Sequence, residues 1–317
     1  MHLNVVKILA VVTGNRRGIM KKYTTYKIES EHADWILESY LKQILQYSGR
    51  KLQKLTRQKG ILLNGKAAFL QKKVKAGDTL RILQEADADY GVLPEEGPVE
   101  ILYEDESMLV LNKPARQLVH PAGQTTKGTL ANYLAHALQQ RHIMATIRPV
   151  HRLDRDTSGC IIFAKDSRSQ FLLEQQLAEK SLQRTYWALV KGSVSPVSGT
   201  ITAPIGAHPT RPNRRAVREQ GDPAVTHYRT ISRYAEYSLL EVTLDTGRTH
   251  QIRLHLAHLG HPILGDGMYG VRVPFLIRQA LHAVSICFRD LKNHREITVQ
   301  APLPQDFRKA MELCQRQ

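Results

Sequence analysis

The sequence predicts an α+β protein made of two parts, a small basic part and a larger part in which strands and helices alternate. Its 317 residues, of which 42% are hydrophobic and 23% are charged, have the composition of a folded globular chain long enough for two domains. The charge changes sign abruptly near residue 82, which marks a boundary. Apolar residues recur at helical spacing in some segments and run continuously, as in buried strands, in others.

The positive charge is concentrated before that boundary. Residues 42–81 hold eleven basic residues and one acid, a net charge of +10, whereas residues 82–110 hold nine acids and no lysine or arginine. Residues 84–98 also contain Gly and Pro and are predicted to be an acidic linker. We therefore expect a small basic domain at residues 21–83 and a larger domain at 99–317. Residues 1–20 fit neither domain. We expect them either to be a tail or to be present only because the start codon has been assigned too far upstream.

The small domain shows two helices followed by strands. Apolar spacing predicts one helix over residues 35–47, stopped by Gly49, and a second over 52–58. Asn64-Gly65 after a short apolar run predicts a hairpin, and residues 74–83, with a turn at Ala76-Gly77-Asp78, are predicted to give another strand. So many charges of one sign repel one another unless a polyanion offsets them, so we expect nucleic-acid binding here. The candidate contacts are basic: Lys54, Arg57, Lys59, Lys66, Lys72 and Lys73.

The larger domain places its most polar stretch before a buried strand. A strand is predicted at residues 109–111 and a helix capped by Thr129 over 129–139. The apolar run at 160–164 is typical of a buried strand, and polar residues 148–159 lead into it. A further helix is predicted over 250–259, capped by Thr249, with Arg253 beside its apolar stripe. A half-buried arginine there requires a carboxylate partner.

Asp154, in that polar stretch, has several possible roles. It can cap a helix or pair with a neighbouring arginine, as loop aspartates commonly do. A paired-carboxylate site with Asp156 is a weak alternative, because two residues of extended chain fix no common face. A Ser-His-Asp arrangement using Ser158 and His151 lacks the glycine pattern of a nucleophile elbow.

Three other patterns are weighed against ordinary structural roles. Residues 265–270 match G-x-G-x-x-G, but no strand leads through them directly into a helix, so nucleotide binding is not expected. His255 and His258 have metal-ligand spacing, but nearby arginines disfavour a cation, and we expect no metal. The loop at 211–218, with Arg214 and Arg215, is predicted to grip phosphates.

Cellular location follows from apolar runs and cysteines. No window approaches the about 18 uninterrupted apolar residues of a membrane span, and no signal-peptide cleavage pattern is seen. The three cysteines are far apart and have no paired spacing, which argues against a disulfide framework. We expect a cytoplasmic protein with reduced thiols, and a monomer.

Two resemblances to known families cover most of the chain. The order helix, helix, "ILLNGK", "VKAGDTLRI" over residues 34–83 resembles a small αL-type RNA-binding domain. "HRLDRDTSG" at 151–159 closely resembles the signature of the RluA-like pseudouridine synthases. Segments at 103–121, 180–192 and 244–270 agree with that family in the same order. The resemblance spans about residues 100–300 and implies a mixed, mainly antiparallel sheet with flanking helices.

The second resemblance also implies an activity and its residues. It makes Asp154 the nucleophile or base that lets a uracil detach from its ribose and rejoin through carbon. It makes Tyr186 the aromatic that stacks on the base, and Arg253 the partner that keeps Asp154 ionised. Arg152 corresponds to the arginine that fills the space left by the flipped uridine.

No cofactor is implied, and the expected partner is structured RNA, with ribosomal RNA favoured over transfer RNA only by the accessory domain. The alternative is a non-catalytic RNA-binding or ribosome-assembly protein. One departure is Arg116, which stands where the family usually has glycine, so the turn there is expected to differ.

Overall fold

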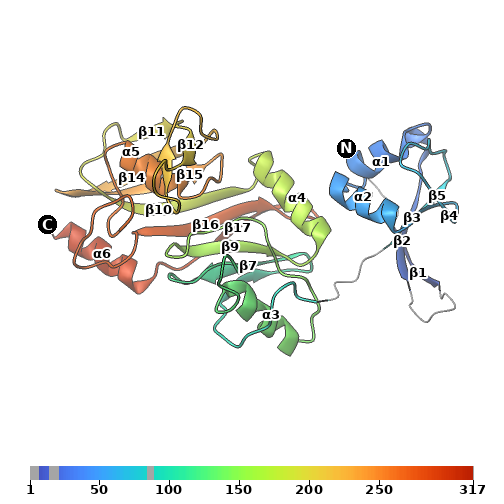
Figure 1. Ribbon diagram of the computed structural model, residues 1–317, viewed down its shortest axis with the longest axis horizontal. Coiled ribbons are helices and arrows are strands. Elements are labelled where there is room, and N and C mark those ends of the chain that lie inside the picture. The colour runs from blue at the N-terminus through green and yellow to red at the C-terminus, as the bar shows by residue number, and fades with distance from the viewer. Residues whose placement is uncertain (1–6, 14–20, 84–88, 317) are drawn as a thin grey trace. The chain divides into compact units, whose positions relative to one another are not determined.

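The computed structural model describes residues 7–13, 21–83 and 89–316, which fall into two compact units, Met1–Ala88 and Asp89–Gln317. Each unit has its own sheet (Figure 1). Each also has its own buried core. Within the described ranges, no helix is long and apolar enough to cross a membrane.

The first unit is a five-stranded sheet with two short helices. The sheet has the order β1-β2-β5-β3-β4, and all its pairings are antiparallel. Leucines of the two helices, among them Leu41 and Leu55, are fully buried in its core. The elements are β1 Lys7–Thr13, β2 Lys21–Lys27, the 3-10 helix η1 Ser30–His32, α1 Leu37–Gln43, α2 Gly49–Arg57, β3 Ile61–Leu63, β4 Lys66–Ala67 and β5 Thr79–Leu83.

The hairpin predicted at Asn64-Gly65 is confirmed. Both residues have positive φ, +50° and +78°, as a tight two-residue turn requires, and they join β3 to β4. The Asn64 side chain also stabilises the turn, because its Nδ2 donates to Asp78 at 2.8 Å and its Oδ1 accepts from the Thr79 amide at 2.8 Å.

Three details of the first unit differ from the sequence-based expectations. Gly49 does not end the first helix: α1 already ends at Gln43, and Gly49 begins α2, after Ser48 has capped it by accepting from the Lys51 amide. The strand expected over 74–83 begins only at Thr79, directly after the expected turn, where Gly77 has φ +81°. Part of the segment expected to be a tail forms strand β1; residues 1–6 and 14–20 lie outside the described residues.

The second unit is built on a ten-stranded sheet. The path β11-β14-β15-β10-β16-β9-β7-β6 is extended by β17 on β16 and β8 on β9. Only β9 and β16 are parallel, so the prediction of a mainly antiparallel sheet with flanking helices is confirmed. Its strands are β6 Ile101–Glu104, β7 Met108–Lys113, β8 Arg148–Pro149, β9 Ser158–Ala164, β10 Gln183–Lys191, β11 Ser198–Ile201, β14 Thr226–Arg233, β15 Tyr237–Leu244, β16 Leu281–Arg289 and β17 Glu296–Gln300.

Helices cover both faces of this sheet. They are α3 Leu130–Gln140, α4 Ser167–Ala178, α5 Gln251–His258 and α6 Gln305–Gln315. On β9, Ile161 and Phe163 face the core that contains α3, α5 and α6, whereas Cys160 and Ile162 face the core that contains α4. All seven residues of β9 are buried, which explains the continuous apolar run in the sequence.

The start of α3 organises the segment before β6. Thr129 caps the helix as predicted, and Asn132 completes a capping box. Asn132 Nδ2 also donates to the Leu93 carbonyl at 2.8 Å, and the buried Tyr90 belongs to the same core as α3. Residues 90–97, assigned from sequence to the linker, are thus packed against the second unit; residues 84–88 lie outside the described residues.

The turn at Arg116 keeps a conformation that glycine favours. Arg116 has φ +64°, in the left-handed region where a side chain is strained. Arg116 therefore adopts a backbone conformation that glycine would adopt without strain.

Candidate active site

Asp154 lies in a loop between β8 and β9 whose backbone is fixed by buried side chains. The ammonium of Lys113, which is fully buried, donates to the Arg155 carbonyl at 3.0 Å and to the carbonyls of Pro114 and Gln117 at 2.7 and 2.8 Å. Arg278 donates to the Asp156 carbonyl from the other side. These bonds hold the loop, so the Asp154 carboxylate has a defined position at the mouth of β9.

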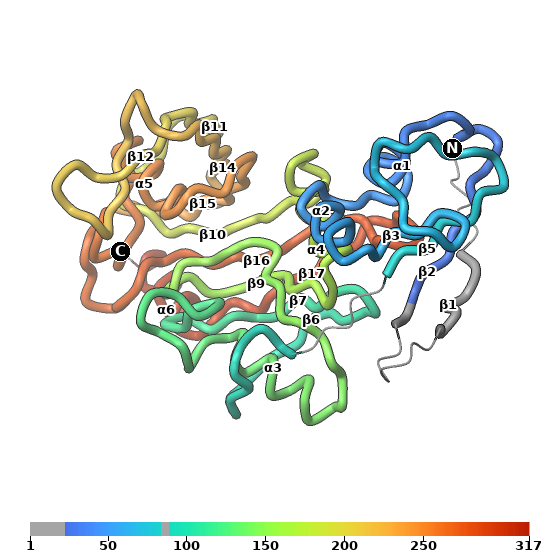
Figure 2. The backbone as a smooth tube through the Cα atoms, turned by 45° about the vertical axis from the view of Figure 1, so that its right-hand side comes forward, coloured from blue at the N-terminus to red at the C-terminus, as the bar shows by residue number. Residues whose placement is uncertain are grey.

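Sheet register brings Tyr186 to the same place. On β10, Tyr186 pairs with Ala283 of β16, and Ala283 pairs with Gly159 of β9, five residues after Asp154. Strands β9 and β16 approach so closely that a Cβ at Gly159 would overlap the Ala283 carbonyl oxygen, and Gly159 has φ +110°. Figure 2 shows β9, β16 and β10 running side by side. The glycine that ends the "HRLDRDTSG" stretch therefore serves this close approach.

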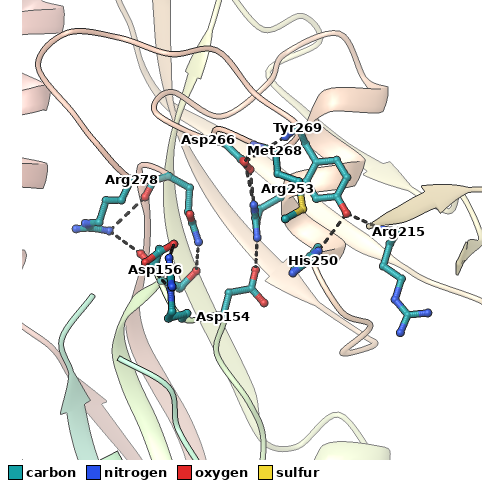
Figure 3. A network of polar contacts seen from close by, with 12 residues as sticks. Asp154, Asp156, Arg215, His250, Arg253, Asp266, Met268, Tyr269 and Arg278 are labelled. Carbon is teal, nitrogen blue, oxygen red and sulfur yellow. Dashed lines mark hydrogen bonds and ion pairs between the residues drawn. The ribbon is translucent and has the colours of Figure 1, made fainter. Parts of the chain in front are cut away.

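Arg253 joins two carboxylates. Its Nη1 donates to Asp154 at 2.9 Å, and its Nε and Nη2 donate to Asp266 at 2.7 and 2.9 Å (Figure 3). The arginine is 7% exposed and the Asp266 side chain is fully buried. The sequence argument that Arg253 needs a carboxylate partner agrees with this geometry. The alternative in which Asp154 pairs with Arg152 or Arg155 is wrong, because Arg155 pairs with Asp156 and, among the described residues, no ion pair joins Arg152 to Asp154.

Asp266 is the residue that the sequence analysis missed. It lies in the glycine-rich stretch 265–270, where a Cβ at Gly265 or Gly270 would overlap the carbonyl oxygens of Arg278 or Ile263. No helix follows this stretch, so the glycines serve a tight loop and not a dinucleotide. The one signal in the sequence was a single acid enclosed by these glycines. Burial raises the Asp266 pKa, but the hydrogen bonds and charge of Arg253, together with hydrogen bonds from the Met268 and Tyr269 amides, outweigh it and hold the pKa below its ordinary value.

The first turn of α5 differs from the expectation. His250, not Thr249, precedes the helix, with φ +59°, and it forms no side-chain cap. Its Nδ1 lies 3.1 Å from the Tyr269 hydroxyl, which accepts from the Arg215 amide at 2.7 Å. The Tyr269 ring also lies 5.2 Å from the Arg253 guanidinium carbon. Tyr269 and His250 thus lie beside Arg253, which is held between Asp154 and Asp266 (Figure 3).

A cavity of about 420 Å³ opens over these groups. Its walls come from the Asp154 loop, from β10 and from residues 244–253, and they include Arg152, Asp154, Arg184, Tyr186, His250 and Arg253. Tyr186 is buried, and burial raises its pKa, so its hydroxyl stays protonated at neutral pH. The three residues that the resemblance made catalytic, Asp154, Tyr186 and Arg253, thus line one cavity.

The predicted RNA-binding residues lie on surfaces of both units. Arg152 is exposed at the cavity, and Arg214 and Arg215 belong to the hairpin of β12 Ile205–Ala207 and β13 Arg215–Val217. The six basic residues predicted in the first unit are all exposed there.

The two histidines weighed as metal ligands include one that is already bonded at both ring nitrogens. His255 Nδ1 lies 2.8 Å from the Thr226 hydroxyl, and its Nε2 lies 2.8 Å from the Ala203 carbonyl. Since His255 is fully buried and both nitrogens have protein partners, its role is structural.

Comparisons with known proteins agree with this geometry. Residues 107–258 match the RNA pseudouridylate synthase family model. The chain is 42% identical over 283 residues to an RNA pseudouridine synthase of Bacillus subtilis, YhcT, covering 88% of this chain and 93% of that protein. It is 34% identical over 282 residues to the ribosomal large subunit pseudouridine synthase D of Escherichia coli, covering 84% and 86%.

A solved structure, human RNA pseudouridylate synthase domain containing 4, superposes with a TM-score of 0.57 at 25% identity, covering 68% of this chain and 93% of that one. The sequence resemblance, the fold and the extent of these matches lead to one assignment: the chain belongs to the RluA-like RNA pseudouridine synthases.

Proposed function

We propose that this enzyme isomerises specific uridines in structured ribosomal RNA, using Asp154 as the essential carboxylate. The observation that carries the proposal is the Asp154–Arg253 ion pair at 2.9 Å in a cavity floored by Tyr186. Ribosomal RNA is favoured because several similar proteins are named ribosomal large subunit pseudouridine synthases. The protein would work as a cytoplasmic monomer without a cofactor.

The reaction conserves every atom except for an exchanged proton. The bond between N1 and C1′ breaks, the uracil turns, and a bond between C5 and C1′ forms. The C5 proton then leaves to solvent, and N1 takes up a proton. Asp154, held ionised by Arg253, acts as nucleophile or base at the sugar or ring, while Tyr186 stacks on the uracil. Arg152 fills the space that the flipped uridine leaves in the RNA.

The first test replaces the proposed carboxylate in the cell. A strain lacking the gene is complemented with the wild type, with Asp154→Asn or with Glu241→Gln, and pseudouridines are mapped across its ribosomal RNA. Glu241 pairs with Arg229 on the surface of the sheet, so this control removes a charge away from the cavity. Sites restored by the wild type and by Glu241→Gln but not by Asp154→Asn are expected. Restoration by Asp154→Asn would refute the mechanism.

The first unit is proposed to bind RNA. In this division, residues 21–83 bind RNA and residues 99–317 carry the chemistry, while residues 90–97 of the segment expected to be a linker pack with the second unit. Lys54, Arg57 and Lys59 on its exposed surface would contact phosphates, and Arg214 and Arg215 would do so beside the cavity.

The second test measures RNA affinity against salt concentration. Neutralising Lys54, Arg57 and Lys59 together should weaken binding and flatten the slope of log affinity against log salt by up to about 2 to 3, since each phosphate contact contributes about 0.7 to 0.9. The matched control neutralises Lys292, Arg295 and Lys309, which are exposed on the second unit. Equal flattening in both triple variants would refute a binding role specific to the first unit.

A further inference from the structure

Arg184 is a buried cation without a carboxylate partner. It lies on β10, is 8% exposed, and its Nε is buried with no hydrogen-bond partner. No ion pair joins its guanidinium to an acid anywhere in the described ranges. The other two buried arginines, Arg253 and Arg278, each bind an aspartate through both Nε and a terminal nitrogen.

Arg184 belongs to the wall of the active-site cavity. Alternate residues of β10 face the same side, so Arg184 and Tyr186 share the face that lines the cavity. Gly247 also lines the cavity, and a Cβ there would lie only 3.3 Å from Arg184 Nη1. The absence of a side chain at Gly247 therefore lets the guanidinium lie close to this part of the cavity wall.

The titratable groups around Arg184 do not offset its charge. Burial, followed by the charge of Arg184, lowers the pKa of His151 to about 3, so that ring is neutral. Tyr186 is also neutral at pH 7. Asp245, another residue of the cavity wall, is bound by Lys180 at 2.6 Å and His227 at 3.1 Å. Asp154 is bound by Arg253.

An unpaired buried charge lowers the stability of the folded protein. Its retention in the cavity wall is explained if the substrate supplies the missing anion. Building on the function proposed above, we propose that Arg184 is a binding residue that pairs with an anionic oxygen of the flipped uridine nucleotide.

The nucleotide offers two sources of such an oxygen. A phosphate is charged before the reaction, so pairing with it would strengthen binding of the RNA. The uracil becomes anionic only when the bond between N1 and C1′ breaks, so pairing with its oxygen would accelerate that step without changing affinity. The two sources are therefore separated by measuring affinity and rate independently.

The experiment compares full-length wild type, Arg184→Met and Arg229→Gln. Arg229 is a surface arginine on the same sheet and serves as control. The substrate is ribosomal RNA from the deletion strain, labelled with tritium at uridine C5, because forming the new bond releases that tritium to water. Single-turnover release at saturating RNA gives the rate. Affinity and its salt slope are measured in the Asp154→Asn background, and melting temperature is measured without RNA.

Arg184→Met should melt at or above the wild-type temperature, because an unpaired buried charge has been removed. Losing one charge-assisted hydrogen bond should reduce either affinity or single-turnover rate about 10- to 100-fold. Reduced affinity with a salt slope smaller by about 0.7 to 0.9 identifies a phosphate, and a reduced rate at unchanged affinity identifies the uracil.

Two results would overturn the inference. One is an Arg184→Met protein that matches Arg229→Gln in both affinity and rate. The other is a lower melting temperature with normal rate and affinity of the folded protein, which would make Arg184 a packing residue. Wild-type protein that releases no tritium would refute the proposed function but not the Arg184 inference. The salt slope of RNA binding would then decide the inference, and an equal slope for Arg184→Met and the wild type would overturn it.

Discussion

Replacing Asp266 by Asn tests whether a fully buried carboxylate holds the Asp154–Arg253 ion pair in place. Asp266 accepts two hydrogen bonds from Arg253, at 2.7 and 2.9 Å, and two from the backbone amides of Met268 and Tyr269, at 2.8 and 3.1 Å. Asn keeps the shape of the side chain but removes its charge and turns one acceptor into a donor that faces the guanidinium. Arg253 is then left with Asp154 as its only carboxylate.

The size of the effect follows from burial. Breaking a buried ion pair by removing one partner lowers the free energy of unfolding by about 3 to 5 kcal/mol. The second unit, Asp89–Gln317, is of a size for which each kcal/mol shifts the melting temperature by about 2 to 4 °C. A decrease of about 6 to 20 °C is expected. Because Arg253 keeps its ion pair with Asp154, we expect a decrease in melting temperature in the lower half of that range. Single-turnover rate should fall as well, because Arg253 no longer has a fixed position.

The assay can observe the second unit alone. The chain has two tryptophans, Trp35 in the first unit and Trp187 on β10. In a Trp35→Phe background, Trp187 fluorescence reports melting of the second unit. Glu241→Gln breaks an exposed ion pair and should change the free energy of unfolding by about 1 kcal/mol or less. An Asp266→Asn protein that melts within the range of this control would refute the reasoning.

Three further predictions concern backbone geometry and pH. Gly159→Ala should prevent the second unit from folding, because its methyl group would overlap the Ala283 carbonyl oxygen. Soluble yield and Trp187 fluorescence measure this loss, and both should match the wild type for the control Gly267→Ala, where a Cβ meets nothing within 4 Å. Arg116→Gly should raise stability by about 0.5 to 1 kcal/mol, since relief of about 1 to 2 kcal/mol of left-handed strain exceeds the entropy cost of glycine; an unchanged or lower denaturant midpoint would contradict it. Burial lowers the pKa of His282 from 6.5 to about 4, so the unfolded chain binds more protons between these values. The neutral His282 ring therefore contributes about 3 kcal/mol to the free energy of unfolding above pH 6.5, and this contribution is lost as the pH falls through about 4. The free energy of unfolding of His282→Gln should depend less steeply on pH between 6.5 and 4 than that of the wild type.

Local patterns were sufficient where a residue's environment is set by its neighbours in sequence. The continuous apolar run of β9 predicted a buried strand, Asn64-Gly65 predicted its hairpin, and Thr129 predicted the start of α3. Each of these signals rests on hydrogen bonds or packing within a few residues.

Helix boundaries were less predictable. Gly49 was expected to end a helix but begins one, because Ser48 supplies the cap and glycine is tolerated in a first turn. Thr249 was expected to cap α5, but the left-handed backbone of His250 starts the helix instead. Several residues at each of these places could cap or break a helix, and the choice depends on contacts made after folding.

The sequence by itself determined the division of charge and marked Arg253 as an arginine in need of a partner, because composition and periodicity are local properties. Its resemblance to the RluA-like synthases implied the mixed sheet and the candidates Asp154 and Tyr186, because motifs are also local. Only the tertiary structure decided that Arg253 is shared between Asp154 and Asp266, and that Arg184 faces the same cavity without a partner. These residues are up to 112 positions apart, from Asp154 to Asp266, and their contacts depend on sheet register and on the close parallel approach of β9 and β16. No local pattern encodes which charged side chains will meet across a sheet.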